Sequence, residues 1–328
     1  MFGIFSTLIL IVSLNLGCTN ASAGDHLESY RTCIYSCVDH ECDTDGYSYL
    51  NDNGDITLSS LIQWPCFDEC KYNCMWDTVD RLESTNVSIP QFHGKWPFIR
   101  IFGIQEPAST LFSLLNLILH FKWIRKFRKR VSHDAPLYWL WHIFAGVCIN
   151  AWFWSVIFHA RDTHFTEFMD YAGAFSIILV NCYVLLIRIC WRLGKLYCFL
   201  ISLFFFLFYV NHALYLYASR RIDYNYNMSL NFSIAIFSVV VWLLWCYWNR
   251  NSKPYVEKCA TFVILTAAVA LLEIIDRPPL YYIFDSHSIW HLSTAFLVGI
   301  FYRFGVSDCK HLKRQELKTK SLNFKKPL

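Results

Sequence analysis

The sequence is poor in charged residues. Only 16% of its 328 residues are Asp, Glu, Lys or Arg, whereas a soluble domain carries about 25%. This scarcity argues against an ordinary soluble domain, and the 55% of hydrophobic and 18% of aromatic residues indicate a protein with several membrane spans. The net charge of +4 is small. Its basic residues gather beside apolar runs, which is a membrane-orientation signal and does not favour nucleic-acid binding.

Residues 1–23 are typical of a cleaved signal peptide. An apolar core runs from Ile4 to Leu16, and the small residues Ala21-Ser22-Ala23 provide a cleavage site. The core is short for a membrane span. The segment before the core has no Lys or Arg, and an uncleaved anchor helix is the alternative interpretation.

Residues 24–98 are polar and rich in cysteine. The six cysteines of this segment are Cys33, Cys37, Cys42, Cys66, Cys70 and Cys74. Behind a signal peptide, an even number of cysteines predicts disulfides, and the repeated four-residue spacing predicts two short helices stapled face to face. Fifteen pairings are possible, and a zinc cluster is the alternative. Asn86-Val87-Ser88 is a glycosylation sequon.

Seven apolar segments follow, each near the ~20 residues that cross a bilayer as a helix. They are residues 104–124, 138–159, 170–189, 196–217, 229–248, 256–275 and 287–304. Lys and Arg cluster after the first, third, fifth and seventh segments, so we expect these regions in the cytosol. The sequence therefore predicts an all-α membrane protein. A seven-transmembrane helix bundle (99–304) follows a small disulfide-rich lumenal N-terminal domain and precedes a cytosolic basic tail (305–328).

Five polar residues lie at the ends of these segments that are predicted to be lumenal. They are Ser155, His159, Asp170, His287 and His291. Residues four apart on a helix share one face, so Ser155 faces the same way as His159, and His287 the same way as His291. Three imidazoles beside a carboxylate are the groups of an open catalytic zinc site. A metal-free His/Asp network, such as a proton relay, is the alternative.

Other polar residues of the apolar segments have plainer explanations. A lone histidine inside a span is more often a hydrogen-bonded packing residue, and we expect this of His120, His142 and His212. Glu273 and Asp276 close the sixth segment at its lumenal end. We expect them to pair with Arg277 or with an interfacial arginine.

Ser155, His159 and Asp170, with His287-x-x-x-His291, resemble the signature of the CREST superfamily of seven-span membrane hydrolases. That superfamily includes alkaline ceramidases and the progestin/adiponectin-type receptors. Within it, three features resemble the post-GPI-attachment-to-proteins factor 3 family, also called Per1-like. These are the cysteine-rich N-terminus, the run Glu106-Pro107-Ala108-Ser109 and the run Phe158-His159-Ala160-Arg161-Asp162. Glu106 itself is expected to brace the first span or to bind a second cation.

The resemblance implies a GPI-specific phospholipase A2 that removes the unsaturated sn-2 acyl chain of GPI-anchored proteins during lipid remodelling. It implies Zn²⁺ as cofactor, with His159, His287 and His291 as ligands. Asp170 would deprotonate the zinc-bound water. Ser155 would support the metal site or hydrogen-bond the developing oxyanion, and a nucleophilic Ser155 stays open.

Two other functions remain as alternatives. A ceramidase-like amidase would use the same site, although the alkaline ceramidases lack this cysteine-rich domain. A seven-span receptor or chaperone would keep the metal for structure only, which the presence of both Ser155 and Asp170 argues against. The resemblance implies the Golgi or the endoplasmic reticulum membrane. Lys325-Lys326 near the end of the chain resembles a dilysine signal read by coat proteins, with a plain basic tail as the alternative.

Overall fold

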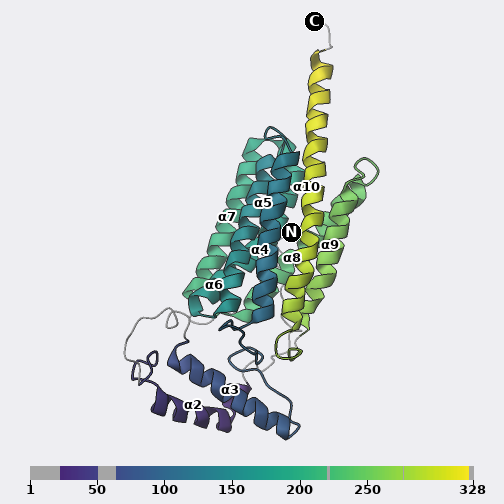
Figure 1. Cartoon of the computed structure of the whole chain (residues 1–328). Helices are drawn as coiled ribbons and strands as arrows, with labels where there is room; N and C mark the ends of the chain where they lie inside the picture. The colour runs from purple at the N-terminus through teal and green to yellow at the C-terminus, as the bar shows by residue number, and fades with distance from the viewer. Residues whose placement is uncertain (1–22, 51–63, 220–221, 276, 325–328) are drawn as a thin grey trace. The chain divides into compact units, whose positions relative to one another are not determined.

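The structure is a computed structural model that describes residues 23–50, 64–219, 222–275 and 277–324. Its regular elements are helices (Figure 1), and strand pairing among the described residues is limited to isolated bridges. The predicted all-α fold is therefore confirmed. The chain divides into two compact units. The predicted signal peptide up to residue 22, Asp276 and Lys325-Lys326 lie outside the described residues.

The first unit is built on two disulfide-bonded helices, α2 (Glu28–Glu41) and α3 (Cys66–Ser84). Its disulfides are Cys33–Cys74, Cys37–Cys70 and Cys42–Cys66. The earliest cysteine pairs with the latest, which is the pairing that two antiparallel helices with four-residue cysteine spacing produce. The predicted disulfide framework is confirmed, and the six sulfur atoms of the alternative zinc cluster are all consumed in these bonds.

A distant segment, residues 277–285, belongs to the same unit. The ring of Tyr282 packs edge-on against Trp76 of α3 at 4.9 Å between centroids, and the Tyr282 carbonyl accepts from the Ile99 N–H at 3.0 Å. The Tyr282 hydroxyl donates to Glu83. Burial and this hydrogen bond raise the pKa of Tyr282 to about 12, so the hydroxyl remains a donor at neutral pH. The loop between α9 and α10 is thus anchored on the disulfide-bonded helices.

Glu106 also has its partner within this unit. The residue is 5% exposed, and one carboxylate oxygen lies 2.6 Å from the Lys95 ammonium. A buried carboxylate without a cation would be costly. Glu106 is thus held by an ion pair at the residue before α4 begins.

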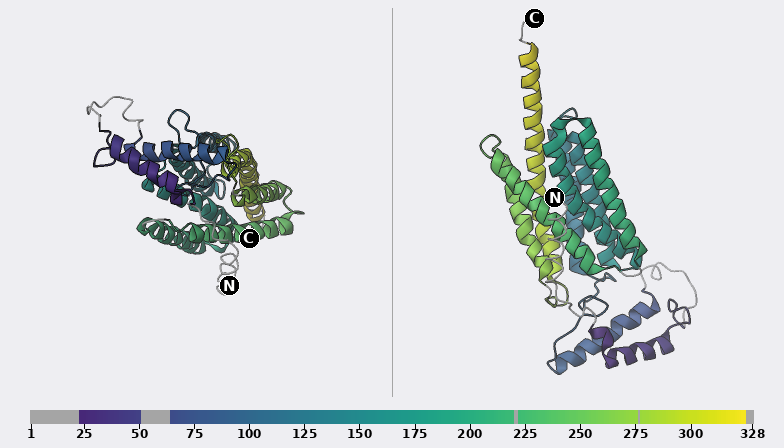
Figure 2. Two further views of the ribbon diagram at one scale, coloured as in Figure 1. Left: turned by 90° about the horizontal axis from the view of Figure 1, so that it is seen from below. Right: turned by 180° about the vertical axis from the view of Figure 1, so that it is seen from behind.

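The second unit is a helix bundle that extends to residue 324. Its long helices are α4 (Pro107–Arg130), α5 (Tyr138–Ala160), α6 (His164–Cys190), α7 (Lys195–Ala218), α8 (Tyr224–Asn249), α9 (Val256–Ala270) and α10 (Ser286–Phe324). Helix α5 packs on α6, and α9 on α10. Helix α8 packs against both α6 and α9, and the view from behind shows it crossing between them (Figure 2).

Five of these helices are long and apolar enough to cross a membrane, namely α5, α6 with its 3₁₀ extension to Leu193, α7, α8 and α10. They identify the chain as a membrane protein, while the count of seven spans stays a prediction. Helix α4 has a lower mean hydropathy because six Lys and Arg residues lie in its last nine positions, and Asn116 and His120 interrupt its apolar part. Helix α9 has 15 residues and continues as a short 3₁₀ helix, η3 (Leu271–Ile274).

The start of α6 differs from the prediction. The third apolar segment was expected to begin at Asp170, but α6 begins at His164. Thr163 and Thr166 form a capping box there: the Thr166 N–H donates to the Thr163 hydroxyl oxygen at 3.2 Å, and the Thr163 N–H donates to Thr166 at 2.8 Å. These bonds satisfy N–H groups that a helix start leaves open. Asp170 therefore lies in the second turn of α6.

Two glycines of α10 allow close packing with its neighbours. A Cβ at Gly305 would lie 2.4 Å from the Trp141 ring of α5, and one at Gly299 would lie 2.5 Å from the Trp123 ring of α4. Trp141 is 1% exposed. The absence of a side chain at these two positions lets bulky rings fill the helix contacts, which fixes α4 and α5 against α10.

A buried ion pair connects α6 to α10. Arg188 lies within α6 and is 8% exposed. Its guanidinium donates to both oxygens of Asp308 at 2.5 and 2.8 Å, and the Tyr255 hydroxyl donates to the same carboxylate at 2.7 Å. Removing one partner of such a pair would leave an uncompensated buried charge. Helix α6 is therefore held in register with α10.

Candidate metal centre

Three histidine rings meet within the helix bundle. His159 lies in the last turn of α5, and His287 and His291 lie in the first two turns of α10. The Nε2 atom of His287 lies 3.4 Å from Nε2 of His159 and 2.8 Å from Nε2 of His291. His159 and His291 are each 2% exposed, and the side chain of His287 is 33% exposed. The predicted meeting of the two histidine runs is confirmed.

The outer nitrogen of His287, meaning the one that points away from the other two histidines, is held by a carboxylate. Its Nδ1 atom lies 2.8 Å from Oε2 of Glu273, in η3. An ionised carboxylate only accepts hydrogen bonds, so Nδ1 carries a proton, and in the neutral ring Nε2 then presents a lone pair. Glu273 was expected to pair with an arginine, and that expectation is wrong: it pairs with a histidine of the cluster. Metal-binding histidines usually have such a partner.

The outer nitrogen of His291 is held by a serine of α4. The Ser113 hydroxyl lies 3.2 Å from Nδ1 of His291 and 3.1 Å from the hydroxyl of Ser155. The Asn116 amide donates to the backbone carbonyl of His291 at 2.7 Å. All three side chains are buried. Ser155 is thus linked to His291 through Ser113.

The nitrogen spacing fits a single zinc ion. Three ligand nitrogens placed tetrahedrally at about 2.0–2.1 Å from zinc lie about 3.4 Å apart. The ligand atoms of His159, His287 and His291 all lie within 4.8 Å of one another. Two of the rings are already oriented by partners at their outer nitrogen. The residues present therefore match an open zinc site with three protein ligands.

The comparison with known proteins agrees with this architecture. The model of the Per1-like family matches residues 57–309. The chain belongs to the Per1-like family. The predicted family is therefore confirmed, and the match includes all five predicted site residues.

Curated Per1-like relatives match nearly the whole chain. Post-GPI attachment to proteins factor 3 of Drosophila melanogaster is 40% identical over 301 residues, covering 90% of this chain and 92% of the relative. GPI-specific phospholipase A2-like PGAP3 of Mus musculus is 38% identical over 310 residues, covering 94% and 95%. The Homo sapiens protein of the same name is 37% identical over 318 residues, covering 96% and 98%. No solved structure matches.

Asp170 of this Per1-like protein lies on α6, the helix that packs on α5. Its side chain, on α6, is partly buried, and the group of ligand atoms within 4.8 Å of one another consists of the three histidines. Helix α6 packs on α5, which carries Ser155 and His159. Hydrogen-bond distances connect Ser155, His159, His287 and His291. The role of Asp170 beside them stays a prediction.

Aromatic rings enclose the histidines in this Per1-like bundle. Trp152 lies edge-on to His291 at 5.1 Å between centroids, Trp290 lies 5.5 Å from His287, and Phe158 lies 5.0 Å from its neighbour His159. Large apolar rings limit the access of bulk water, and the low dielectric that results strengthens electrostatic interactions. Trp152 of α5 and Trp290 of α10 thus form part of this aromatic wall.

Three further histidines of the bundle lie outside the cluster. His120 Nδ1 lies 3.2 Å from the Tyr302 hydroxyl, and His142 Nδ1 lies 3.0 Å from the Tyr138 carbonyl. His212 Nε2 lies 3.2 Å from the side-chain carbonyl of Asn227. These partners confirm the expected packing role of all three histidines.

Proposed function

We propose that this protein is a zinc-dependent lipid ester hydrolase of the phospholipase A2 type. It removes the unsaturated sn-2 acyl chain of GPI-anchored proteins during lipid remodelling. The mouse and human relatives are named GPI-specific phospholipase A2-like, which supports the substrate class. The observation that carries the proposal is the convergence of three histidine Nε2 atoms inside a membrane-protein bundle.

His159, His287 and His291 hold the zinc ion in this proposal. Bound zinc supplies a nucleophilic water at neutral pH and polarises the ester carbonyl. Glu273 accepts the Nδ1 proton of His287 and so keeps its Nε2 available as a ligand. Ser113 orients the ring of His291.

Asp170 acts as the general base and Ser155 as a supporting residue. The Asp170 carboxylate takes a proton from the attacking water and returns it to the departing glycerol oxygen, so that a fatty acid and a lysolipid result. The contact between Ser155 and Ser113 favours support of the metal site for Ser155. An sn-2 ester lies just below the lipid headgroup, which is the depth expected for residues in the terminal turns of membrane helices.

Glu273, the hydrogen-bond partner of His287 Nδ1, is expected to affect zinc binding less than the ligands themselves do. Glu273→Gln should lower zinc affinity by about 10–100-fold, the usual effect of losing such a partner, because a neutral amide no longer strengthens the basicity of the ring. Competition with a chelator of known affinity measures this. The matched control is Glu257→Gln, an exposed position in the first turn of α9, which should bind zinc as the unchanged protein does. Equal affinities for the two variants would contradict the role of Glu273.

The proposal requires the N-terminal and C-terminal ends of the chain to lie on opposite sides of the membrane. Asn86 should carry a glycan in the lumen, while the tail after α10 should be open to protease from the cytosol. Glycosidase treatment of sealed microsomes, with and without detergent, and a C-terminal epitope tag measure the two locations. Finding both sites on one side would mean an even number of spans and would remove the shared lumenal depth of the site.

The test of the function is acyl release from a purified GPI-linked protein. The full-length protein in detergent should convert the diacyl anchor to its lyso form, with a free unsaturated fatty acid detected by mass spectrometry. Ceramide serves as the competing substrate. Release of fatty acid from ceramide alone would replace the proposal with the amidase alternative, and a zinc-loaded protein inactive on both would favour a receptor or chaperone.

Location and coat binding complete the proposal. We place the protein in the Golgi or endoplasmic reticulum membrane, with a lumenal N-terminus and a cytosolic C-terminus. Lys325 and Lys326 serve as a retrieval signal for coat proteins. Their replacement by serine should move the protein to later compartments in imaging, and an unchanged distribution would exclude that role.

A further inference from the structure

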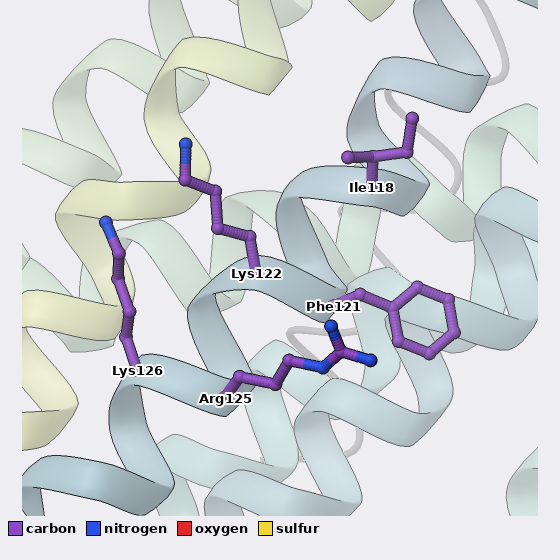
Figure 3. Close-up of a pocket in the computed structure, with 5 residues that line it drawn as sticks. All are labelled: Ile118, Phe121, Lys122, Arg125 and Lys126. Atoms are coloured by element: carbon purple, nitrogen blue, oxygen red, sulfur yellow. The ribbon is translucent and has the colours of Figure 1, made fainter.

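Helix α4 carries an open depression of about 510 Å³, and Figure 3 draws the side chains that line it. No residue of the histidine cluster is among them. The depression is lined by Ile118, Phe121, Lys122, Arg125 and Lys126. These residues follow the spacing i, i+3, i+4, i+7 and i+8, so they form one stripe of the helix. The volume falls in the range of about 300–1,000 Å³ that ligand sites occupy.

The stripe continues toward the start of α4 through Leu114 and Leu111, and this end of it is apolar. Leu111, Leu114, Ile118 and Phe121 are 59%, 39%, 53% and 45% exposed. The ten-residue step from Leu111 to Phe121 spans about 15 Å at 1.5 Å per residue. Half of a hydrocarbon core of about 30 Å is the same length. The apolar part of the stripe therefore matches the depth of one membrane leaflet.

The other end of the stripe is basic. Lys122, Arg125 and Lys126 follow directly after Phe121, and among the described residues no carboxylate forms an ion pair with any of them. The ammonium of Lys126 lies 4.5 Å from the centre of the Trp123 ring, which holds it beside the stripe. Three cations thus meet an apolar track at the level where a lipid headgroup begins.

We propose that this stripe binds an anionic phospholipid, with one acyl chain along Leu111–Phe121 and the phosphate at Lys122, Arg125 and Lys126. Basic residues at the membrane surface attract anionic lipids, and an apolar track of one leaflet's length selects a lipid over a soluble phosphate. The site faces away from Ser113 and Asn116, which lie on the buried face of the same helix. It is independent of the hydrolytic centre.

Lipid retention on the purified, full-length protein tests this site. Delipidated protein in detergent is titrated with phosphatidylserine or phosphatidylcholine, and bound lipid is counted by native mass spectrometry. The triple variant K122Q/R125Q/K126Q should weaken phosphatidylserine binding by about 100-fold, since each of the three basic residues near a membrane surface contributes about fivefold. Phosphatidylcholine should bind weakly to both proteins.

The matched control removes the same charge from the same helix. Arg128, Lys129 and Arg130 are exposed in the last turn of α4 and lie outside the depression. R128Q/K129Q/R130Q should change binding less than threefold, and equal losses in the two triples would overturn the site in favour of diffuse attraction. Glycerophosphoserine, which lacks acyl chains, should not compete. Competition by that soluble headgroup would overturn the lipid assignment, as would equal binding of the two lipids to the unchanged protein.

Discussion

Replacing His291 by alanine is expected to leave the purified protein without zinc and to reduce acyl release to background. The ring contributes one of three ligand nitrogens, and its Nε2 lies 2.8 Å from that of His287. Two histidines remain after the change, which is fewer than the three protein ligands of known catalytic zinc sites. The loss should exceed the 10–100-fold effect of removing an outer partner. Metal analysis and the GPI-lipid assay measure the two effects.

The control for this prediction is another buried histidine. His212 is 1% exposed and is bonded to Asn227, so His212→Ala removes a ring of equal burial away from the cluster. This variant should retain its zinc and its hydrolysis, provided that its thermal unfolding confirms a folded protein. A His291→Ala protein with full zinc content and normal hydrolysis would show that His291 is not a ligand.

Asp170→Asn is expected to separate metal binding from chemistry. The amide keeps the shape of the side chain but cannot take a proton from water, so hydrolysis should fall by roughly 10²–10⁴-fold, the usual range for a lost general base. Zinc content should stay at the unchanged level, because the three histidines are intact. Metal analysis and kcat on the same preparation measure both quantities.

Asp223→Asn serves as the control for Asp170→Asn, and Ser155→Ala serves as a comparison. Asp223 caps α8 and accepts from the Tyr226 N–H at 3.0 Å; asparagine caps helices equally well, so Asp223→Asn should leave hydrolysis unchanged. Ser155→Ala should retain zinc and lose about 10²–10³-fold if Ser155 donates to the oxyanion, and less if it acts only through Ser113. A trapped acyl-enzyme would make Ser155 a nucleophile. Near-normal hydrolysis by zinc-bound Asp170→Asn would rule out its role as base.

The histidine cluster could be predicted from the sequence because helices obey simple spacing. His287 and His291 are four residues apart, and alternation of the spans brings His159 to the same depth as both. Antiparallel neighbouring helices then leave little freedom for the three rings. The zinc ion and the part played by Asp170 remain predictions, since they depend on side-chain distances that spacing does not give.

The outer partners of the cluster could not be predicted in the same way. Glu273 lies fourteen residues before His287, and the intervening loop is anchored on the disulfide-bonded helices through Tyr282. Nothing local indicates that its carboxylate meets His287 rather than an arginine. Ser113 and Asn116 gave a weak signal, as polar residues on one face of an apolar helix. The ion pair of Arg188 with Asp308 could not be predicted either, because the two residues lie 120 positions apart in the chain.

The sequence by itself determined the helical class, the membrane character, the disulfide framework and the meeting of three histidines. Each follows from local rules: hydropathy over some twenty residues, cysteine spacing and the helical period. Only the tertiary structure decided the cysteine pairing, the hydrogen bonds of Glu273 and Ser113 to the outer histidine nitrogens, and the close packing at Gly299 and Gly305. These features join residues far apart in the chain, and such contacts are selected by the packing of whole helices rather than by their individual sequences.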